Sequence, residues 1–133
     1  MYKLAILDDD HHWCLVVQRF LKQDYDITIH KSVSSFLYEF DNLSQYDVLL
    51  IDFVLPTARH EPELDGVEII ARLKRLPFPP IIILVTAYMN KYELEVNSKK
   101  MCPEADGFFA KDSGLDLLAQ RMKQLLAEGT PGR

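Results

Sequence analysis

Five short runs of β-forming residues, each separated from the next by a segment of helical spacing, place the strongest constraint on the fold of this chain. The runs at 3–7, 47–51 and 81–85 are almost continuously apolar, which is typical of parallel strands covered on both faces. Strands that alternate with helices form right-handed βαβ units. The sequence therefore predicts a three-layer α/β sandwich around a parallel sheet. The expected strands are 3–7, 26–30, 47–51, 81–85 and 107–110.

The segments between these runs predict helices, and two of them begin at good N-cap residues. Ser32 and Asp65 each precede an apolar-periodic stretch, and both residue types cap helices well. The segment 88–101 is the least regular, because its apolar residues fit no single helical face, and Pro103 breaks its end. The expected helices are 11–23, 32–40, 66–76, 88–101 and 113–128.

Composition favours one domain, which we place at 1–128, with 129–133 as a C-terminal tail or the start of a linker. The chain has 133 residues, is 48% hydrophobic and carries a net charge of -5 without any basic tract, which argues against direct nucleic-acid binding. Cys14 and Cys102 lack metal-ligand spacing and fit thiols in a reducing compartment. No apolar run reaches the ~20 residues that cross a bilayer, and the acidic N-terminal region is unlike a signal peptide. We therefore expect a cytoplasmic protein without membrane partners.

Polar side chains follow four of the five expected strands. The carboxyl ends of parallel strands share one edge of a sheet, and ligands bind there at a switch point in strand order. In the common order 2-1-3-4-5 the first and third strands are neighbours, so the carboxylates that follow them come together. The residues at these strand ends are Asp8, Asp9 and Asp10, then Asp52, Thr86 and Lys111.

Neighbouring carboxylates repel each other, and a divalent cation removes that repulsion. Mg²⁺ suits such a site, because it binds carboxylate oxygens and keeps water molecules at its other coordination positions. A carboxylate beside the ion can also attack phosphorus as a nucleophile. Lys111 can neutralise charge in such a transfer and Thr86 can donate a hydrogen bond to a phosphoryl oxygen. Each feature alone is also common as a turn, a cap or a solvent-exposed residue, so the prediction depends on their joint placement. His11 and His12 could extend the cluster to a transition-metal site, but polar residues at a helix start are the better interpretation.

Five stretches of the chain, taken in sequence order, resemble the motifs of the receiver domain of bacterial two-component response regulators. The resemblance covers about residues 2 to 128 and implies a flavodoxin-like, doubly wound (βα)5 fold with strand order 2-1-3-4-5. The stretches are "LAILDDD", "YDVLLIDFVLP", "LDGVEII", "PPIIILVTAY" and "ADGFFAKD".

The resemblance implies a phosphoacceptor and a metal site. Asp52 is the residue that accepts the phosphoryl group. Asp9 ligates Mg²⁺ directly, Asp8 acts through metal-bound water, Asp52 is itself a ligand and the backbone carbonyl of Val54 is a further one. Family members take the phosphoryl group from a phosphohistidine of a sensor histidine kinase or a phosphotransfer protein. They are not enzymes beyond promoting their own phosphotransfer and dephosphorylation.

The resemblance also implies a switch. Thr86 senses the phosphoryl group, Phe108 changes rotamer with it, and Lys111 pairs first with the Asp52 carboxylate and then with a phosphoryl oxygen. The response is expected on the surface formed by 88–101, 107–110 and 113–128, toward an effector domain or a second copy of the chain.

Three departures from the family pattern stand out. The loop at 57–65 carries an insertion of about six residues, either a tolerated surface loop, since lengthening costs little, or a partner-contact or lid segment. Asp112 replaces the usual proline after Lys111. Because a non-proline cis bond costs ~2.5–4 kcal/mol, we expect either a trans peptide with an altered loop or a strained one. Segment 88–106 is longer than usual, which predicts an atypical output face.

Two other functions remain open at this point. A Mg²⁺-dependent phosphohydrolase with an aspartyl nucleophile needs a second acid two residues after it, where this chain has Val54. An interaction domain that kept the fold without being phosphorylated is the other alternative.

Overall fold

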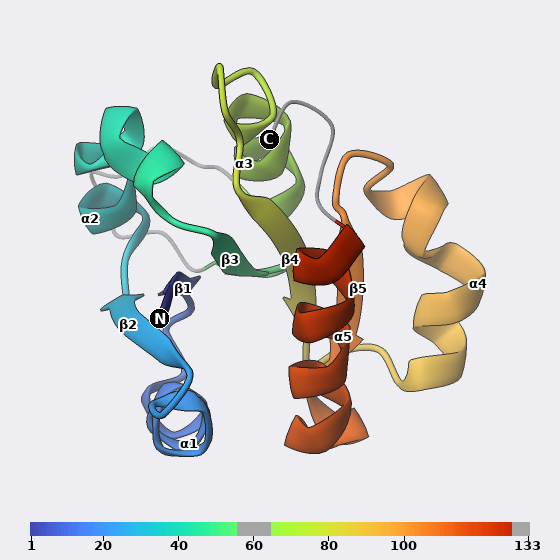
Figure 1. Cartoon of the computed structure of the whole chain (residues 1–133). Coiled ribbons are helices and arrows are strands. Elements are labelled where there is room, and N and C mark those ends of the chain that lie inside the picture. The colour runs from blue at the N-terminus through green and yellow to red at the C-terminus, as the bar shows by residue number, and fades with distance from the viewer. Residues whose placement is uncertain (56–64, 129–133) are drawn as a thin grey trace.

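The computed structural model describes residues 1–55 and 65–128, and it confirms the predicted three-layer α/β fold. Five parallel strands form one sheet in the order β2-β1-β3-β4-β5, with helices on both faces (Figure 1). Residues 57–64 of the expected insertion and the tail at 129–133 lie outside the described residues. The strands are β1 (Tyr2–Leu7), β2 (Tyr25–His30), β3 (Val48–Asp52), β4 (Ile81–Thr86) and β5 (Gly107–Ala110).

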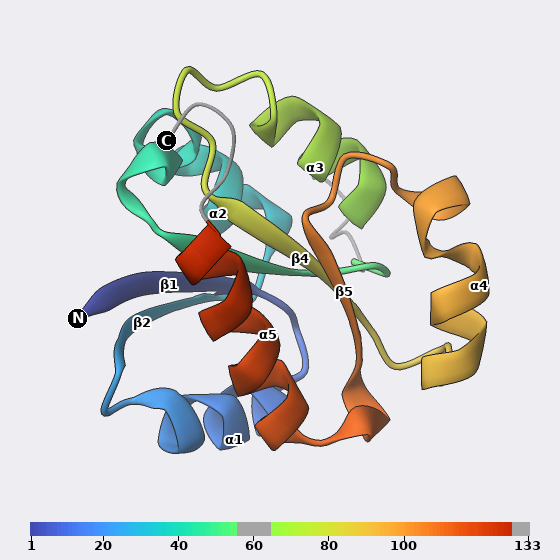
Figure 2. The ribbon, with the colours of Figure 1, turned by 45° about the vertical axis from the view of Figure 1, so that its right-hand side comes forward.

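The helices cover the two faces of the sheet unequally. α1 and α5 lie together on one face, whereas α2 and α3 cover the other, beside α4 (Figure 2). Their bounds are α1 (His11–Leu21), α2 (Val33–Tyr38), α3 (Gly66–Leu73), α4 (Lys91–Met101) and α5 (Leu115–Glu128).

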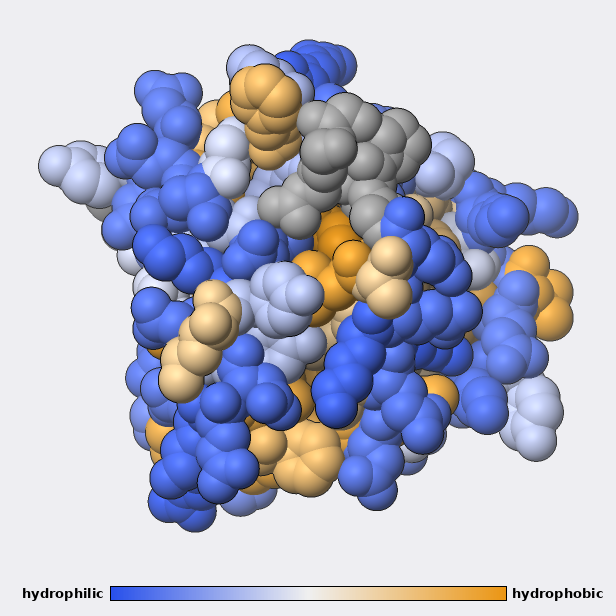
Figure 3. All heavy atoms as spheres, in the orientation of Figure 1, coloured by the Kyte–Doolittle hydropathy of each residue, from blue (hydrophilic) through white to orange (hydrophobic). Residues whose placement is uncertain are grey.

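Alternate residues of β3 fill two separate apolar cores. Leu49 and Ile51 belong to the core beneath α2 and α3, while Val48 and Leu50 belong to the core beneath α1 and α5. All four side chains are fully buried, so both faces of the strand demand apolar residues. This explains why the apolar run of β3 is unbroken. On the outside, the face of the molecule seen in Figure 3 is dominated by hydrophilic residues.

The predicted caps at Ser32 and Asp65 are confirmed, but several helices are shorter than expected. The Ser32 side chain accepts the Ser35 N–H at 3.1 Å, and the Asp65 carboxylate accepts the Glu68 N–H at 2.9 Å. α2 stops at Tyr38, and the 3₁₀ segment η1 (Phe40–Gln45) follows it. η1 buries Leu43 in the core, so tertiary packing takes over from the local helical pattern there. α1 and α3 end two and three residues before the predicted positions.

α4 is a helix, as predicted, although it has hardly any apolar face. Only Leu94 and Ser98 of this helix are buried, whereas Tyr92 and Val96 are 77% and 76% exposed. The helix begins three residues later than predicted, because Asn90 caps it in a reciprocal capping box with Glu93. The capping box at its N-terminus therefore explains where α4 begins better than the burial of an apolar face does.

The corner between β5 and α5 takes the first of its two expected forms. The described residues contain no cis peptide bond, and Asp112 lies in a short 3₁₀ turn, η2 (Lys111–Ser113). Gly114 then adopts a φ of 90°, which a residue with a Cβ rarely reaches, and α5 begins directly after it. The altered loop keeps Lys111 at the end of β5. None of the described helices is long and apolar enough to cross a membrane.

Candidate functional site

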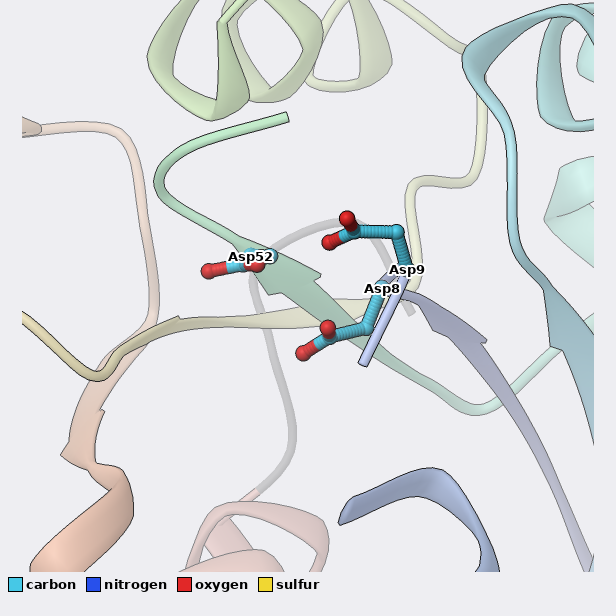
Figure 4. Close-up of side chains that lie close together, drawn as sticks. All are labelled: Asp8, Asp9 and Asp52. Carbon is cyan, nitrogen blue, oxygen red and sulfur yellow. The ribbon is translucent and has the colours of Figure 1, made fainter. Parts of the chain in front are cut away.

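Three carboxylates converge at the carboxyl edge of the sheet, as the sequence predicted. Asp8 and Asp9 extend from the tip of β1 toward the end of β3, where Asp52 lies (Figure 4). One carboxylate oxygen of each residue lies within 4.8 Å of the others. Asp8 is 1% exposed and Asp52 7%, whereas Asp9 is exposed. Two desolvated carboxylates and one solvent-facing carboxylate therefore share the pocket.

Strand pairing fixes the two buried carboxylates. The register sets Leu7 opposite Ile51, so the residues that follow on β1 and β3 are neighbours. The Asp8 N–H donates to the His30 carbonyl at 3.0 Å, which continues the ladder with β2 by one bond. Beyond Asp52, the Phe53 N–H donates to the Val85 carbonyl at 2.8 Å. Hydrogen bonds to flanking strands therefore hold the backbone at both positions.

Gly66, at the start of α3, packs directly against the backbone of Asp52. A Cβ built on Gly66 would lie 2.3 Å from the Asp52 carbonyl oxygen, a distance that real Cβ atoms do not reach. The Gly66 N–H also donates to the Phe53 carbonyl at 3.2 Å. Sequence reasoning placed this glycine in a family motif but assigned it no role. The only available signal was the Asp65–Gly66 pair, because the close approach is a tertiary feature.

Burial and mutual repulsion perturb the acids of the pocket. Burial, reinforced by the charges of Asp8 and Asp9, raises the pKa of Asp52 to about 7, although Lys111 and a hydrogen bond from the Val54 backbone oppose this. Burial also raises the pKa of Asp8. A hard divalent cation with oxygen ligands would relieve this electrostatic cost, so the donor set fits Mg²⁺.

The raised pKa of Asp52 predicts that the stability of the metal-free protein depends on pH. Between pH 3.8 and about 7 the Asp52 carboxyl is protonated in the folded protein and ionised in the unfolded chain. The contribution of Asp52 to the free energy of unfolding is therefore complete below pH 3.8 and is lost as pH rises through about 7. Urea unfolding in a chelator at several pH values measures it. Asp52→Asn should remove this fall, and an identical pH profile for both proteins would contradict the assignment.

Lys111 does not pair with Asp52, the partner that the sequence analysis expected, but with two other carboxylates. Its ammonium Nζ lies 2.9 Å from Asp8 Oδ2 and 3.6 Å from Asp10 Oδ2, and no ion pair with Asp52 occurs among the described residues. Asp52 acts on Lys111 only through longer-range attraction. The reason is burial, since Asp8 is the least exposed carboxylate of the pocket and an unpaired charge there is costly. Burial alone would lower the pKa of Lys111, but its contacts with Asp8 raise it overall.

Thr86 and Phe108 lie on the neighbouring strands β4 and β5, and Thr86 is the last residue of β4. The Thr86 side chain is completely buried, and its Oγ1 accepts the Tyr88 N–H at 3.0 Å, which leaves the hydroxyl hydrogen able to donate. Phe108 lies beside Leu84 in the register of β4 and β5 and is partly buried. Val54 and Tyr88 are both exposed. The roles expected for Thr86, Phe108 and Val54 stay predictions.

The two histidines at the start of α1 do not join the acidic cluster. His11 Nδ1 lies 2.6 Å from the Lys31 ammonium, and His12 is exposed. Among residues 1–55 and 65–128, the one group of acids, histidines and cysteines arranged to hold a metal is Asp8, Asp9 and Asp52. Asp10 instead caps α1 by accepting the Trp13 N–H at 3.1 Å, which supports the interpretation of this stretch as a helix start.

Comparison with solved structures supports the fold. The receiver domain of the Francisella response regulator 1452 is 22% identical, with a TM-score of 0.75 over 96% of this chain and 98% of that one. A CheY-like response regulator receiver domain protein from Methanospirillum hungatei is 24% identical, with a TM-score of 0.72 over 96% and 95%. The BeF3-activated receiver domain of DrrB, from Thermotoga maritima, is 22% identical, with a TM-score of 0.74 over 97% and 99%.

A sequence profile provides the family. No curated protein sequence matches the chain. The profile of the response regulator receiver domain, however, matches residues 4–123, which include most of β1, all of β2 to β5 and every residue of the pocket. The match spans far more than half of the 133 residues, and the protein therefore belongs to the response regulator receiver domain family.

Proposed function

We propose that Asp52 is the phosphoacceptor of this two-component receiver domain and takes its phosphoryl group from a phosphohistidine. The observation that supports this most directly is the convergence of three carboxylates, with oxygens within 4.8 Å, around a nucleophile held at a strand end. The donor is a sensor histidine kinase or a phosphotransfer protein, and the compartment that we expect is the cytoplasm. The five strands and helices of residues 1–128 form the receiver unit in this proposal.

Asp52 is the nucleophile in the transfer. One oxygen of its carboxylate attacks the phosphorus, and the bond from phosphorus to the imidazole nitrogen of the donor breaks, with the electron pair leaving on nitrogen. Asp9, Asp8 through water, Asp52 and the carbonyl of Val54 would hold Mg²⁺, which supplies positive charge to the phosphoryl oxygens when bound. The ammonium of Lys111 supplies a further positive charge from within the chain.

The response begins at Thr86. Its buried hydroxyl can donate to a phosphoryl oxygen, and a small displacement would open space for the ring of Phe108. Such a step couples a local charge to a packing change. A cavity of about 280 Å³ lies between α4, β5 and α5, and Phe108 is among its lining residues together with Leu94 and Arg121. We propose that this surface carries the signal to an effector domain or a second copy.

Incubation with acetyl phosphate separates the candidate functions. With Mg²⁺ we expect one phosphoryl group per chain, and with EDTA none, both measured by intact-protein mass spectrometry. Continuous release of inorganic phosphate would instead support the phosphohydrolase. Neither incorporation nor release would support an interaction domain that is not phosphorylated. The exposed apolar side chain of Val54, where a phosphohydrolase needs its acid, favours a switch over turnover.

Tyr88 and Val54 predict slow loss of the phosphoryl group. Both side chains are exposed, and they stand two residues after Asp52 and two residues after Thr86. A bulky ring at this edge of the sheet would hinder the approach of an attacking water. Tyr88→Ala is expected to shorten the half-life of phosphorylated Asp52 severalfold, measured by phosphate release after removal of the donor. Tyr92→Ala removes an equally exposed ring from α4 and serves as the control. Rapid hydrolysis that Tyr88→Ala leaves unchanged would contradict this role.

A further inference from the structure

Three groups hold the ammonium of Lys111 on the α1 side of the pocket. Asp8 Oδ2 lies at 2.9 Å, Asp10 Oδ2 at 3.6 Å, and the ring centroid of Trp13 at 4.7 Å from Nζ. The Lys111 side chain is only 11% exposed, so water contributes little to its solvation. An ammonium over an indole face, within about 6 Å, is attracted by the electrons of the ring. Asp10 and Trp13 thus join Asp8 in holding the ammonium, in place of the expected Asp52.

Asp10 and Trp13 are fixed in place independently of Lys111. Asp10 Oδ1 accepts the Trp13 N–H at 3.1 Å as the N-cap of α1, which leaves Oδ2 directed at the ammonium. The Trp13 ring packs against the core beneath α1 and α5. The cap hydrogen bond, together with Lys111, lowers the pKa of Asp10, so its carboxylate stays charged. The contacts of Lys111 are therefore made to side chains that α1 orients.

We propose that Asp10 and Trp13 form a resting site for the Lys111 ammonium and that a phosphoryl group on Asp52 competes with this site. The proposal rests on the function proposed above for Asp52. A phosphoryl group adds about -1.5 to -2 charge beside Asp52, and drawing the ammonium toward it weakens the contacts with Asp10 and Trp13. These two are positioning residues: they act through Lys111 and set how readily the phosphorylated state forms.

Trp13 is the single tryptophan of the chain, so its fluorescence reports on the resting site without any reaction. Lys111→Met is expected to change the Trp13 emission of the unliganded protein, whereas Lys100→Met, on the exposed part of α4, is not. Adding Mg²⁺ and beryllofluoride to the unsubstituted protein should change the emission in the direction given by Lys111→Met. Identical emission from Lys111→Met and the unsubstituted protein would overturn the resting site, whether or not the chain is phosphorylated.

Beryllofluoride affinity then tests the competition. Trp13→Leu removes the ring, and Asp10→Asn removes the charge while keeping a good N-cap. Each is expected to tighten beryllofluoride binding about two- to fivefold in calorimetric titrations with Mg²⁺. The matched controls are Phe20→Leu, another partly exposed aromatic of α1, and Asp26→Asn, an exposed acid of β2; neither should change the affinity.

The outcomes separate this proposal from the one on which it rests. If the unsubstituted protein binds no beryllofluoride and takes up no phosphoryl group, the function proposed for Asp52 fails, and the emission of Lys111→Met still decides the resting site. If it binds beryllofluoride but Trp13→Leu and Asp10→Asn bind with unchanged or weaker affinity, Asp52 keeps its function and the competition is refuted.

Discussion

Asp52→Asn is expected to abolish incorporation of phosphate from acetyl phosphate while leaving the fold intact. The amide has nearly the volume of the carboxylate but is not a nucleophile toward phosphorus. Because burial raises the pKa of Asp52 to about 7, the substitution also removes a charge that is unfavourable above that pH. We therefore expect unfolding in a chelator at pH 8 to show equal or greater stability than the unsubstituted protein. Intact-protein mass spectrometry and urea unfolding measure the two effects.

The matched control for Asp52→Asn is Asp26→Asn, which makes the same chemical change at an exposed position of β2. It should be phosphorylated like the unsubstituted protein. Phosphate on another residue of Asp52→Asn, located by peptide mapping, would overturn the assignment of the phosphoacceptor. Loss of cooperative unfolding in Asp52→Asn would instead show that the carboxylate is needed for the fold.

Gly66→Ala is expected to lower the free energy of unfolding by about 2–3 kcal/mol, in the upper part of the range for overpacked sites. The added Cβ would meet the Asp52 carbonyl oxygen at 2.3 Å and the Phe53 Cα at 3.1 Å. Both are backbone atoms, so relief requires α3 or the end of β3 to move. Because that backbone carries the phosphoacceptor, the rate of phosphorylation by acetyl phosphate should fall as well.

Gly107→Ala is the control for Gly66→Ala. Its Cβ would approach the Leu125 Cδ1 at 3.1 Å, and the end of a flexible side chain can move aside. Its loss of stability should therefore be clearly smaller, and its phosphorylation should be unchanged. Equal stability of the two variants, with equal phosphorylation rates, would show that the contact between α3 and Asp52 does not constrain the site.

The sequence predicted the elements whose signal is local or periodic. All five strands appear within one residue of their expected bounds. For β1, β3 and β4 the reason is that strands buried on both faces need unbroken apolar runs. Ser32 and Asp65 cap helices as expected, since capping depends on residues three apart. The ends of α1, α2 and α3 were less predictable, because the core decides which turn continues. α2 ended at Tyr38 instead of residue 40, and the 3₁₀ segment Phe40–Gln45 that follows, in which Leu43 is buried, was not predicted.

By itself, the sequence determined the parallel sheet and the meeting of Asp8, Asp9 and Asp52, because strand order and a residue's place after its strand are enough to bring them to one edge. Only the tertiary structure decided that Lys111 pairs with Asp8 and Asp10 over the ring of Trp13, and that Gly66 touches the backbone of Asp52. Ion pairs and close approaches depend on which of several neighbours is more buried and better oriented. That competition is settled by the packing of α1, α3 and α5 on the sheet, which periodicity along the chain does not encode.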